Sequence, residues 1–240
     1  MAHSESNNYI GGPADAPEGG GSAIRNPGWK TGIRIGSAKD GSLTYFIEGT
    51  RPEGLAADEL GNIFWAKAES LGALVFIHPQ GVPQLSARLE GNGFLTNVIG
   101  NPLETTIALS HLIFEGTLDR FPGLRICGAH GGGFLPSYNG RFDQGCVAFP
   151  ANCTKTLKKR PSEYLKQLYF DSMVFSSEGL RHLVAEYGAS QIVMGTDYPF
   201  PWTTRAVDHV LSTPGLTDAD RTAILGGNLA RLLGIDQKSG

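Results

Sequence analysis

From about residue 65 onward, the sequence predicts an α/β fold built on a parallel sheet. Short, continuous apolar runs that each end in glycine or a polar residue are typical of strands buried on both faces. Patterns of helical periodicity separate these runs, so that strand and helix alternate about four times. Such alternation indicates either a doubly wound sheet or part of a barrel, and active sites in both lie at the C-terminal ends of the strands.

The predicted elements follow one another in a regular order. Strands are expected at residues 73–77, 124–127, 168–170 and 191–194. Helices are expected at residues 103–121, 178–187 and 218–233. Thr217 directly precedes the last of these helices and is a suitable N-cap, because its hydroxyl can accept a hydrogen bond from a backbone N–H of the first turn.

The first 64 residues differ from the rest in composition. Residues 1–30 are crowded with glycine, proline, serine and asparagine, and such a segment buries too little apolar surface to offset its ordering entropy, so we expect a flexible arm. Residues 31–64 contain short alternating runs between turn signals, which predict a β-rich segment. Its antiparallel strands are expected at residues 31–35, 43–47 and 61–64. Residues 65–240 then form the α/β part.

Charge and hydropathy exclude two classes of partner. Lys and Arg number 20 against 23 Asp and Glu, and no basic run is longer than Lys158-Lys159-Arg160. Because nucleic-acid binding requires a basic surface, we expect no nucleic-acid partner. No stretch approaches the roughly 18 consecutive apolar residues of a membrane helix, so we expect no membrane span. The N-terminus lacks the basic and apolar regions of a secretory signal, which predicts a cytoplasmic location.

The three cysteines, Cys127, Cys146 and Cys153, are an odd number without CxxC spacing. This argues against a disulfide framework and against a structural zinc site. We therefore expect reduced thiols with a structural role.

Polar side chains lie at the ends of all four predicted strands. His78 lies in FIHP, His130 in GAHGGG, Asp171 in YFDS and Asp197 in GTDYPFPW. Any one of these can be a structural core or capping residue. Imidazole and carboxylate groups that meet at the ends of parallel strands are, however, the donors that a catalytic divalent metal requires. The pattern therefore predicts one shared site that includes His78, His130 and Asp197.

The glycine run after His130 has two further interpretations, a phosphate-binding loop and the oxyanion loop of an esterase. The sequence contains no GxxxxGK, no GxGxxG after a strand and no GxSxG, so Walker, Rossmann and serine-hydrolase mechanisms lack their required residues. We expect the glycines to let the backbone approach a bound ligand. His111 lies in an apolar helical pattern, where a structural role is favoured over a position behind the site. No role is assigned to His3, His182 or His209.

Four segments of the chain together resemble a known family. They read WAKAESLGALVFIHPQG, ALSHLIFEGTLDRFPGLRICGAHGGG, YFDS and QIVMGTDYPFPW. They resemble the aminocarboxymuconate-semialdehyde decarboxylase branch of the amidohydrolase superfamily. The resemblance as a whole runs with little interruption from Trp65 to about Gly234. The resemblance implies the C-terminal half of a (β/α)8 barrel of the TIM type, with about four βα units. It implies a metal-dependent lyase or hydrolase that decarboxylates a small carboxymuconate-like or aromatic acid without oxidation.

The resemblance also implies a role for each site residue. His78 and Asp197 bind a divalent metal, zinc in most of the family, with manganese as the alternative. His130 is the catalytic acid and base, and Asp197 belongs to the catalytic set as well. Arg141 in NGRFDQG corresponds to an arginine that a neighbouring subunit contributes, and a guanidinium holds a substrate carboxylate with two parallel hydrogen bonds. We therefore expect a homodimer.

The sequence departs from that family in two respects. Family members carry a His-x-His pair on the first barrel strand, which supplies two further metal ligands, and this chain contains no His-x-His. Residues 31–64 instead resemble one blade of an NHL-type or gluconolactonase-like β-propeller. Because one blade cannot close a propeller, the simplest interpretation is a fusion near Phe64 of a propeller fragment with half of a decarboxylase barrel. Half a barrel leaves sheet edges unpaired, and either the pairing of two copies or the β-rich N-terminal segment could cover them.

Two functions follow from these observations. The first is an active metal-dependent decarboxylase or hydrolase acting on a small carboxylate. The second is a catalytically inactive fusion product that keeps the family fold as a structural or binding module, because a site without the His-x-His pair offers at most three protein ligands and binds metal more weakly. A lactonase activity of the N-terminal segment is a third alternative, which its single blade disfavours.

Overall fold

The computed structural model describes residues 65–235 with short gaps, and five strands within residues 1–64. The gaps are residues 66–67, 81–82, 154–155, 199 and 203–204. The five strands are β1 (Ala2–Glu5), β2 (Tyr9–Ile10), β3 (Ile24–Arg25), β4 (Gly32–Gly36) and β5 (Leu43–Glu48). The chain divides into two compact units, residues 1–56 and residues 57–240, which are described separately.

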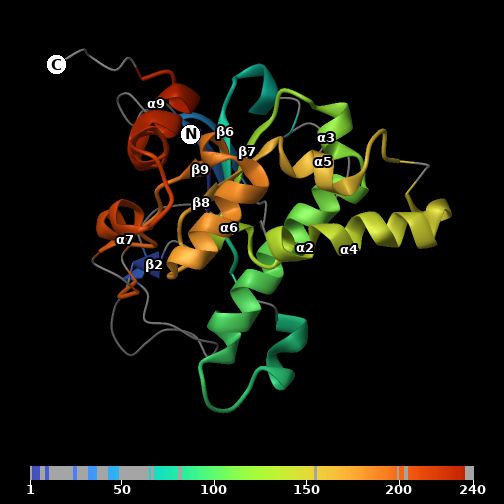
Figure 1. Cartoon of the computed structure of the whole chain (residues 1–240). Coiled ribbons are helices and arrows are strands. Elements are labelled where there is room, and N and C mark those ends of the chain that lie inside the picture. Colours follow the sequence, from blue (N-terminus) through green and yellow to red (C-terminus); the bar gives the residue numbers. More distant parts are fainter. Residues whose placement is uncertain are drawn as a thin grey trace. The chain divides into compact units, whose positions relative to one another are not determined.

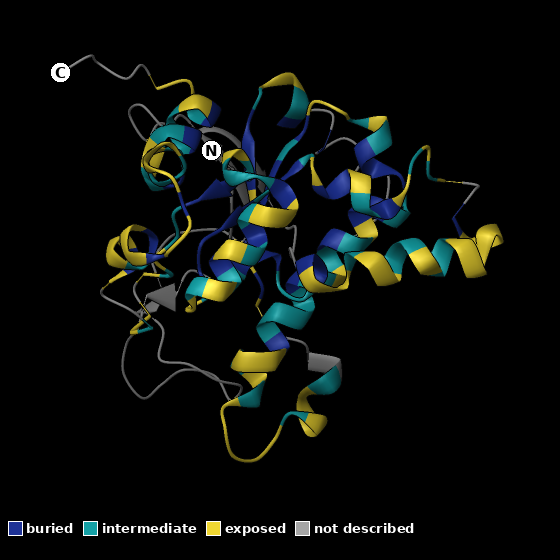
Figure 2. Ribbon diagram, viewed as in Figure 1, coloured by how far each residue is buried: buried dark blue, intermediate teal, exposed yellow. Residues whose placement is uncertain are grey.

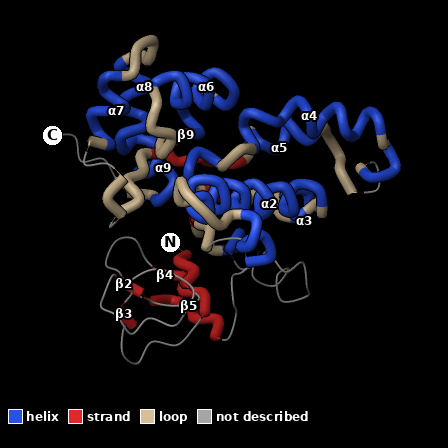
Figure 3. Tube along the Cα trace, turned by 90° about the horizontal axis from the view of Figure 1, so that it is seen from below, coloured by secondary structure: helices blue, strands red, loops and turns tan. Residues whose placement is uncertain are grey.

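In the first unit, all described elements are strands (Figure 3). β1 pairs with β4 and β4 with β5, both antiparallel, and β2 forms an antiparallel pair with β3. β4 and β5 confirm two of the strands predicted from the sequence, whereas the strand predicted at residues 61–64 lies outside the described residues. β1, β2 and β3 fall within the predicted flexible arm. Strands can form there because backbone hydrogen bonding does not require the apolar side chains that this segment lacks. The mobility of the arm stays a prediction.

The second unit is built on a parallel sheet. Its strands are β6 (Leu74–Ile77), β7 (Arg125–Gly128), β8 (Leu168–Asp171) and β9 (Ile192–Val193). Each strand pairs in parallel with the next one along the chain, in the order β6-β7-β8-β9. Ile77 pairs with Gly128, and Asp171 pairs with Val193, so the C-terminal ends of the strands lie at one edge. The predicted α/β class, the parallel sheet and the four strand positions are confirmed.

Helices connect and flank these strands (Figure 1). Between β6 and β7 lie η1 (Pro83–Arg88), η2 (Thr96–Gly100), α2 (Asn101–Phe114) and α3 (Thr117–Arg120). Between β7 and β8 lie η3 (His130–Gly132), α4 (Leu135–Ala148), η4 (Pro150–Asn152) and α5 (Pro161–Leu165). Between β8 and β9 lie α6 (Ser177–Tyr187) and η5 (Ala189–Gln191). After β9 come α7 (Ala206–Ser212), α8 (Asp218–Thr222), η6 (Ala223–Gly227) and α9 (Asn228–Leu233).

The three predicted helices are present, two of them with interruptions. Gly116, with a φ of 71°, separates α2 from α3 within the helix predicted at residues 103–121. Thr217 caps α8 as predicted, since its hydroxyl accepts a hydrogen bond from the N–H of Asp220 at 3.1 Å. The sequence pattern missed α4, α5 and α7, because these segments are short or rich in polar residues and glycine. No helix in the described part of the chain combines the length and apolar character needed to cross a bilayer.

Buried apolar side chains hold the last helix against the sheet, whose strands are largely buried (Figure 2). Leu74 of β6, Cys127 of β7 and Val193 of β9 pack in one cluster with Leu232 of α9. Full burial of an apolar side chain of this size stabilises a fold by about 1.5–3 kcal/mol. The segment after β9 is therefore part of the sheet's core.

A buried asparagine joins the same helix to the strand. The side-chain amide of Asn228, which is 0% exposed, donates hydrogen bonds to the carbonyl of Ala189 at 2.7 Å and to that of Ile192 at 2.6 Å. Its own oxygen accepts a hydrogen bond from Arg231 at 3.0 Å. Both carbonyls flank the start of β9, so Asn228 fixes the position from which this strand enters the sheet.

α4 projects from the body of this unit, and its residues 137–148 are exposed or half-buried (Figures 1 and 2). A disulfide joins Cys146, near the end of this helix, to Cys153, with their Cα atoms 5.6 Å apart. The expectation of reduced thiols is therefore wrong for these two residues. The turn of η4 folds the chain back on the end of the helix and brings the two cysteines together. The spacing of the cysteines in the sequence does not reveal this turn. Cys127 is a free, buried thiol.

Replacing Asn228 by alanine is expected to destabilise the protein by about 2 kcal/mol, because two buried carbonyl groups lose their donor. For a chain of this size, this corresponds to a fall in Tm of about 4–8 °C, measured by thermal unfolding. The matched control is Asn92→Ala, because Asn92 is exposed and its loss should change stability by less than about 0.5 kcal/mol. Equal Tm values for the two variants would contradict the role given to Asn228.

Candidate metal centre

Three of the predicted residues meet at the C-terminal edge of the parallel sheet. His78 directly follows β6, and His130 and Asp197 lie in the loops that follow β7 and β9. One ligand atom of each lies within 4.8 Å of the other two. Nε2 of His78 is 3.4 Å from Oδ1 of Asp197, and Nε2 of His130 is 3.7 Å from Oδ2. The structure thus places the carboxylate between two imidazoles.

Two of these residues have a backbone conformation that residues other than glycine rarely adopt. φ is 54° at both His130 and Asp197. Such a conformation costs on the order of 1–3 kcal/mol and persists only where the surrounding structure fixes it, most often at functional sites. The strain falls on two of the three residues that form the cluster, which supports a functional role for their loops.

The glycines after His130 pack against the protein itself. A Cβ atom on Gly131 would lie 2.5 Å from Val174, and one on Gly132 would lie 2.6 Å from the ring of Phe170. A Cβ atom on Gly133 would lie 2.1 Å from the carbonyl oxygen of Pro102 in α2. The glycines therefore make room for β8, α2 and the loop after β8, and the expectation that they let the backbone approach a ligand stays a prediction.

A glutamate that the sequence analysis missed holds the loop after β6. The carboxylate of Glu104, in the first turn of α2, accepts a hydrogen bond from the N–H of Gln80 at 2.7 Å. Gln80 lies two residues beyond His78, so this bond fixes the chain close to the imidazole. The sequence does show an acidic residue, Glu104, at the start of the helix predicted from residue 103. Acidic residues are common at helix starts for electrostatic reasons alone, so this position did not indicate a role at the site.

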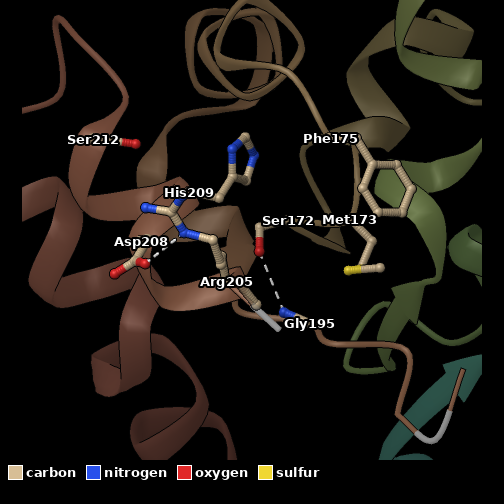
Figure 4. Close-up of a pocket in the computed structure, with 9 residues that line it drawn as sticks. Ser172, Met173, Phe175, Gly195, Arg205, Asp208, His209 and Ser212 are labelled. Atoms are coloured by element: carbon tan, nitrogen blue, oxygen red, sulfur yellow. Dashed lines mark hydrogen bonds and ion pairs between the residues drawn. The ribbon is translucent and has the colours of Figure 1, made fainter. Parts of the chain in front are cut away.

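The end of β8 holds the other two loops. Asp171 accepts a hydrogen bond from the N–H of Gly131 at 2.8 Å, next to His130. The hydroxyl of Ser172 accepts one from the N–H of Gly195 at 3.3 Å, in the loop that leads to Asp197 (Figure 4). Asp171 was expected at a strand end of the site, and the structure directs its carboxylate to the backbone.

The charges of the cluster shift its pKa values in opposite directions. Burial raises the pKa of Asp197, but the nearby imidazoles of His130 and His78 lower it by more, so that its pKa lies well below the usual range. Burial lowers the pKa of His130, but the adjacent carboxylate of Asp197 and the negative charge of Asp171 raise it above its ordinary value. Asp197 is therefore ionised, and His130 holds a proton more firmly than a free imidazole.

The donor set fits a divalent metal ion. Two imidazole nitrogens and a carboxylate oxygen are borderline ligands that suit zinc and also manganese. The carboxylate is ionised and ready to bind, and the side chain of His78 is 38% exposed, which leaves the cluster open to a small ligand. The residues present therefore fit a divalent cation.

Arg141, the expected substrate ligand, does not lie in this cluster. It is exposed on α4. His111 is also exposed and pairs with Glu115 on the surface of α2, so it does not lie behind the site. His182 and His209 lie on α6 and α7.

A cavity of about 250 Å³ borders the loop that carries Asp197 (Figure 4). Ser172 and Gly195 line it at the strand ends, and Arg205 and His209 line it at α7. Nε of Arg205 donates to the carboxylate of Asp208 at 2.9 Å. Burial lowers the pKa of His209, which keeps this imidazole neutral near pH 7. The cavity is therefore polar without a strong net charge.

Fold and site together define an α/β protein with a candidate metal centre at the ends of its parallel strands. The amidohydrolase family model matches residues 44–235, and the chain belongs to this family. The match begins inside residues 31–64, for which the sequence predicts a propeller blade. The blade stays a prediction.

The most similar proteins include several decarboxylases. The chain is 35% identical over 177 residues to the 2-amino-3-carboxymuconate-6-semialdehyde decarboxylase of Dictyostelium discoideum, covering 71% of this chain and 47% of that protein. It resembles the structure of 5-carboxyvanillate decarboxylase from Sphingomonas paucimobilis, with a TM-score of 0.67, 26% identity and coverage of 75% and 54% of the two chains. It also resembles a Polaromonas dihydroxybenzoic acid decarboxylase with bound manganese and 2-nitroresorcinol. In this case the TM-score is 0.67, the identity is 25%, and the match covers 74% of this chain and 54% of the other. The chain spans about half the length of these relatives.

Replacing His78 by alanine is expected to weaken the binding of Mn²⁺ or Zn²⁺ by at least about tenfold, because even a partner of a metal ligand commonly contributes that much. Isothermal titration calorimetry on the full chain measures the affinity. His111→Ala is the matched control, since this histidine is exposed and outside the cluster. The assignment fails if the two variants bind the metal equally well.

Proposed function

We propose that this chain carries part of a metal-dependent decarboxylase barrel that acts on a small carboxylated acid. The observation that supports the proposal most directly is the convergence of His78, His130 and Asp197 at the ends of three strands. The printed names of its relatives favour non-oxidative decarboxylation of a carboxymuconate-like or aromatic acid. Four successive parallel strands agree with the C-terminal half of a (β/α)8 barrel. The expected location is the cytoplasm, without a nucleic-acid partner.

In this proposal His78 and Asp197 hold the metal, which is zinc or manganese. A metal bound there would supply a Lewis acid and lower the pKa of its bound water. The pKa of Asp197 lies well below its usual range, so its carboxylate is available at neutral pH without first losing a proton. The manganese in the Polaromonas relative favours a trial of Mn²⁺ beside Zn²⁺.

His130 is the proposed proton carrier. A histidine that ligates a metal usually donates its second ring N–H to a fixed partner. Nδ1 of His130 is buried and has no hydrogen-bond partner among the described residues. The ring therefore lacks the hydrogen bond that would orient it as a permanent metal ligand. When carboxylate leaves as carbon dioxide, the electron pair that remains on carbon must accept a proton. His130 can deliver it from Nε2, and because its pKa is raised it holds that proton more firmly than a free imidazole does.

Arg141 is proposed to hold a substrate carboxylate at the site of a second copy. Its exposed position on α4, outside the cluster of its own chain, is compatible with a role across an interface. The same helix and its C-terminal end also expose Tyr138, Val147 and Phe149 by 55%, 72% and 66%. Exposed apolar groups beside an arginine are typical of the core of a protein interface. We therefore propose a homodimer through α4.

His130→Gln is expected to lower the rate of decarboxylation by roughly 10²–10⁴-fold, since the variant loses its proton carrier. Carbon dioxide release is measured with Mn²⁺ and, in turn, 2-amino-3-carboxymuconate-6-semialdehyde, 5-carboxyvanillate and 2,6-dihydroxybenzoate as substrates. His111→Gln is the control and should keep the rate. Equal rates for both variants would remove His130 from the mechanism.

A catalytically inactive binding module is the alternative function. The cluster contains three donors in the described part of the chain, and the sequence has no His-x-His pair to add to it. If the metal-loaded protein binds these acids but releases no carbon dioxide from any of them, the binding module replaces the enzyme as the function.

Val147→Glu is expected to convert a dimer into a monomer, because it places a charge in the proposed interface on α4. Sedimentation velocity on the full chain measures the change. Val207→Glu on α7 is the control, since Val207 is also exposed, by 46%, and lies on a different helix. A monomeric starting protein, or a dimer that survives Val147→Glu, would contradict the proposed interface.

A further inference from the structure

We infer that Asp171 is a positioning residue that holds the His130 loop in its strained conformation and thereby sets the geometry of the metal centre. The Mn²⁺-affinity measurement that tests this inference rests on the proposed function, whereas the hydrogen-exchange measurement does not. Asp171 is 4% exposed, and its carboxylate is directed at backbone N–H groups. A carboxylate buried at this level requires a compensating set of donors.

The donors come from both sides of the strand end. Oδ1 of Asp171 accepts hydrogen bonds from the N–H of Gly131 at 2.8 Å and from the N–H of Met173 at 3.0 Å. The backbone of His130 also lowers the pKa of this carboxylate, which burial raises. One of the two hydrogen-bond donors therefore belongs to the loop that carries the proposed proton carrier, and the other belongs to the loop after β8.

The conformation of that loop explains why it needs an anion. Four consecutive residues have positive φ angles, namely His130 at 54°, Gly131 at 63°, Gly132 at 80° and Gly133 at 67°. Successive N–H groups in such turns point to one side and form a concave site for an anion. Here the chain supplies the anion itself. Without it, the N–H of Gly131 would lose its acceptor, and the left-handed histidine would be held only by the packing and the backbone hydrogen bonds of the glycines that follow it.

Asp171 also contacts the loop that carries Asp197, the third residue of the metal cluster. A Cβ atom on Gly195 would lie 2.9 Å from Cβ of Asp171, so this part of the Asp197 loop packs directly on the aspartate. The neighbouring Ser172 accepts the N–H of Gly195 (Figure 4). The last residues of β8 therefore fix the loops on both sides of the strand. A change at Asp171 should therefore move the loop of Asp197, a proposed metal ligand, as well as the loop of His130.

A purely structural cap would give a different result from a positioning residue. Asp143 provides the comparison, because its carboxylate also accepts two hydrogen bonds, from the N–H and the hydroxyl of Ser162 at 2.9 and 2.7 Å. Asp143 lies on α4, outside the metal cluster. Loss of its charge should affect α4 and α5 locally and leave the metal centre unchanged.

The test compares Asp171→Asn, Asp171→Ala and Asp143→Asn in the full chain. In the metal-free protein, hydrogen exchange by mass spectrometry should show faster exchange in a peptide covering residues 130–133 for both Asp171 variants, with other strands unchanged. The affinity for Mn²⁺ should fall by about tenfold or more for Asp171→Ala. The fall should be smaller for Asp171→Asn, which keeps an acceptor oxygen. Asp143→Asn should match the unaltered protein in both measurements.

Two results would overturn the inference. One is a folded Asp171→Ala variant with normal protection of residues 130–133 and normal Mn²⁺ affinity. The other is loss of folding in both Asp171 variants, which would assign Asp171 to the fold as a whole. If the unaltered protein binds no Mn²⁺, the proposed function fails, whereas the exchange measurement still decides the role of Asp171.

Discussion

The parallel pairing of β6, β7, β8 and β9 is the constraint on which the candidate metal centre depends. Because neighbouring strands run in the same direction, residues far apart in sequence leave the sheet at one edge. His78 and Asp197 are separated by 119 positions, yet their side chains are 3.4 Å apart. No local interaction could bring them together. The apolar cluster that holds α9 on β6, β7 and β9 therefore acts on the site as well as on stability.

The strand edge sets the distances, but polar contacts behind the site determine how each side chain is presented. Glu104, Asp171 and Ser172 each accept a backbone N–H from one of the three loops. Gly131 and Gly133 add close packing against the protein, which leaves the His130 loop little freedom to relax. The strained backbone conformations of His130 and Asp197 are thus held by contacts with residues outside the cluster.

The sequence predicted the part of this arrangement that periodicity encodes. Buried strands produce apolar runs, so the residues at their ends could be identified, and His78, His130 and Asp197 lie together in the structure. The role of the glycines could not be read in this way, because it depends on how closely Pro102 and Phe170 approach them in space. The disulfide was missed because it depends on the local turn of η4, which brings Cys146 and Cys153 together although they are seven positions apart. Periodicity carries information about burial, whereas neither an irregular turn nor the close approach of distant segments leaves a regular pattern.

The opposite pKa shifts at the centre separate the roles of its two loops. Asp197 stays ionised because two imidazoles lie beside it, so a cation can replace part of that interaction without the release of a proton from the carboxylate. Asp197 and Asp171 together raise the pKa of His130, whereas burial opposes them. A cation at Asp197 would weaken the first of these attractions and would itself repel a protonated imidazole, so His130 would release its proton more readily with the cation present. Asp171 opposes this loss of the proton while its carboxylate accepts the N–H of Gly131, so one buried group acts on both the charge of His130 and the conformation of its loop.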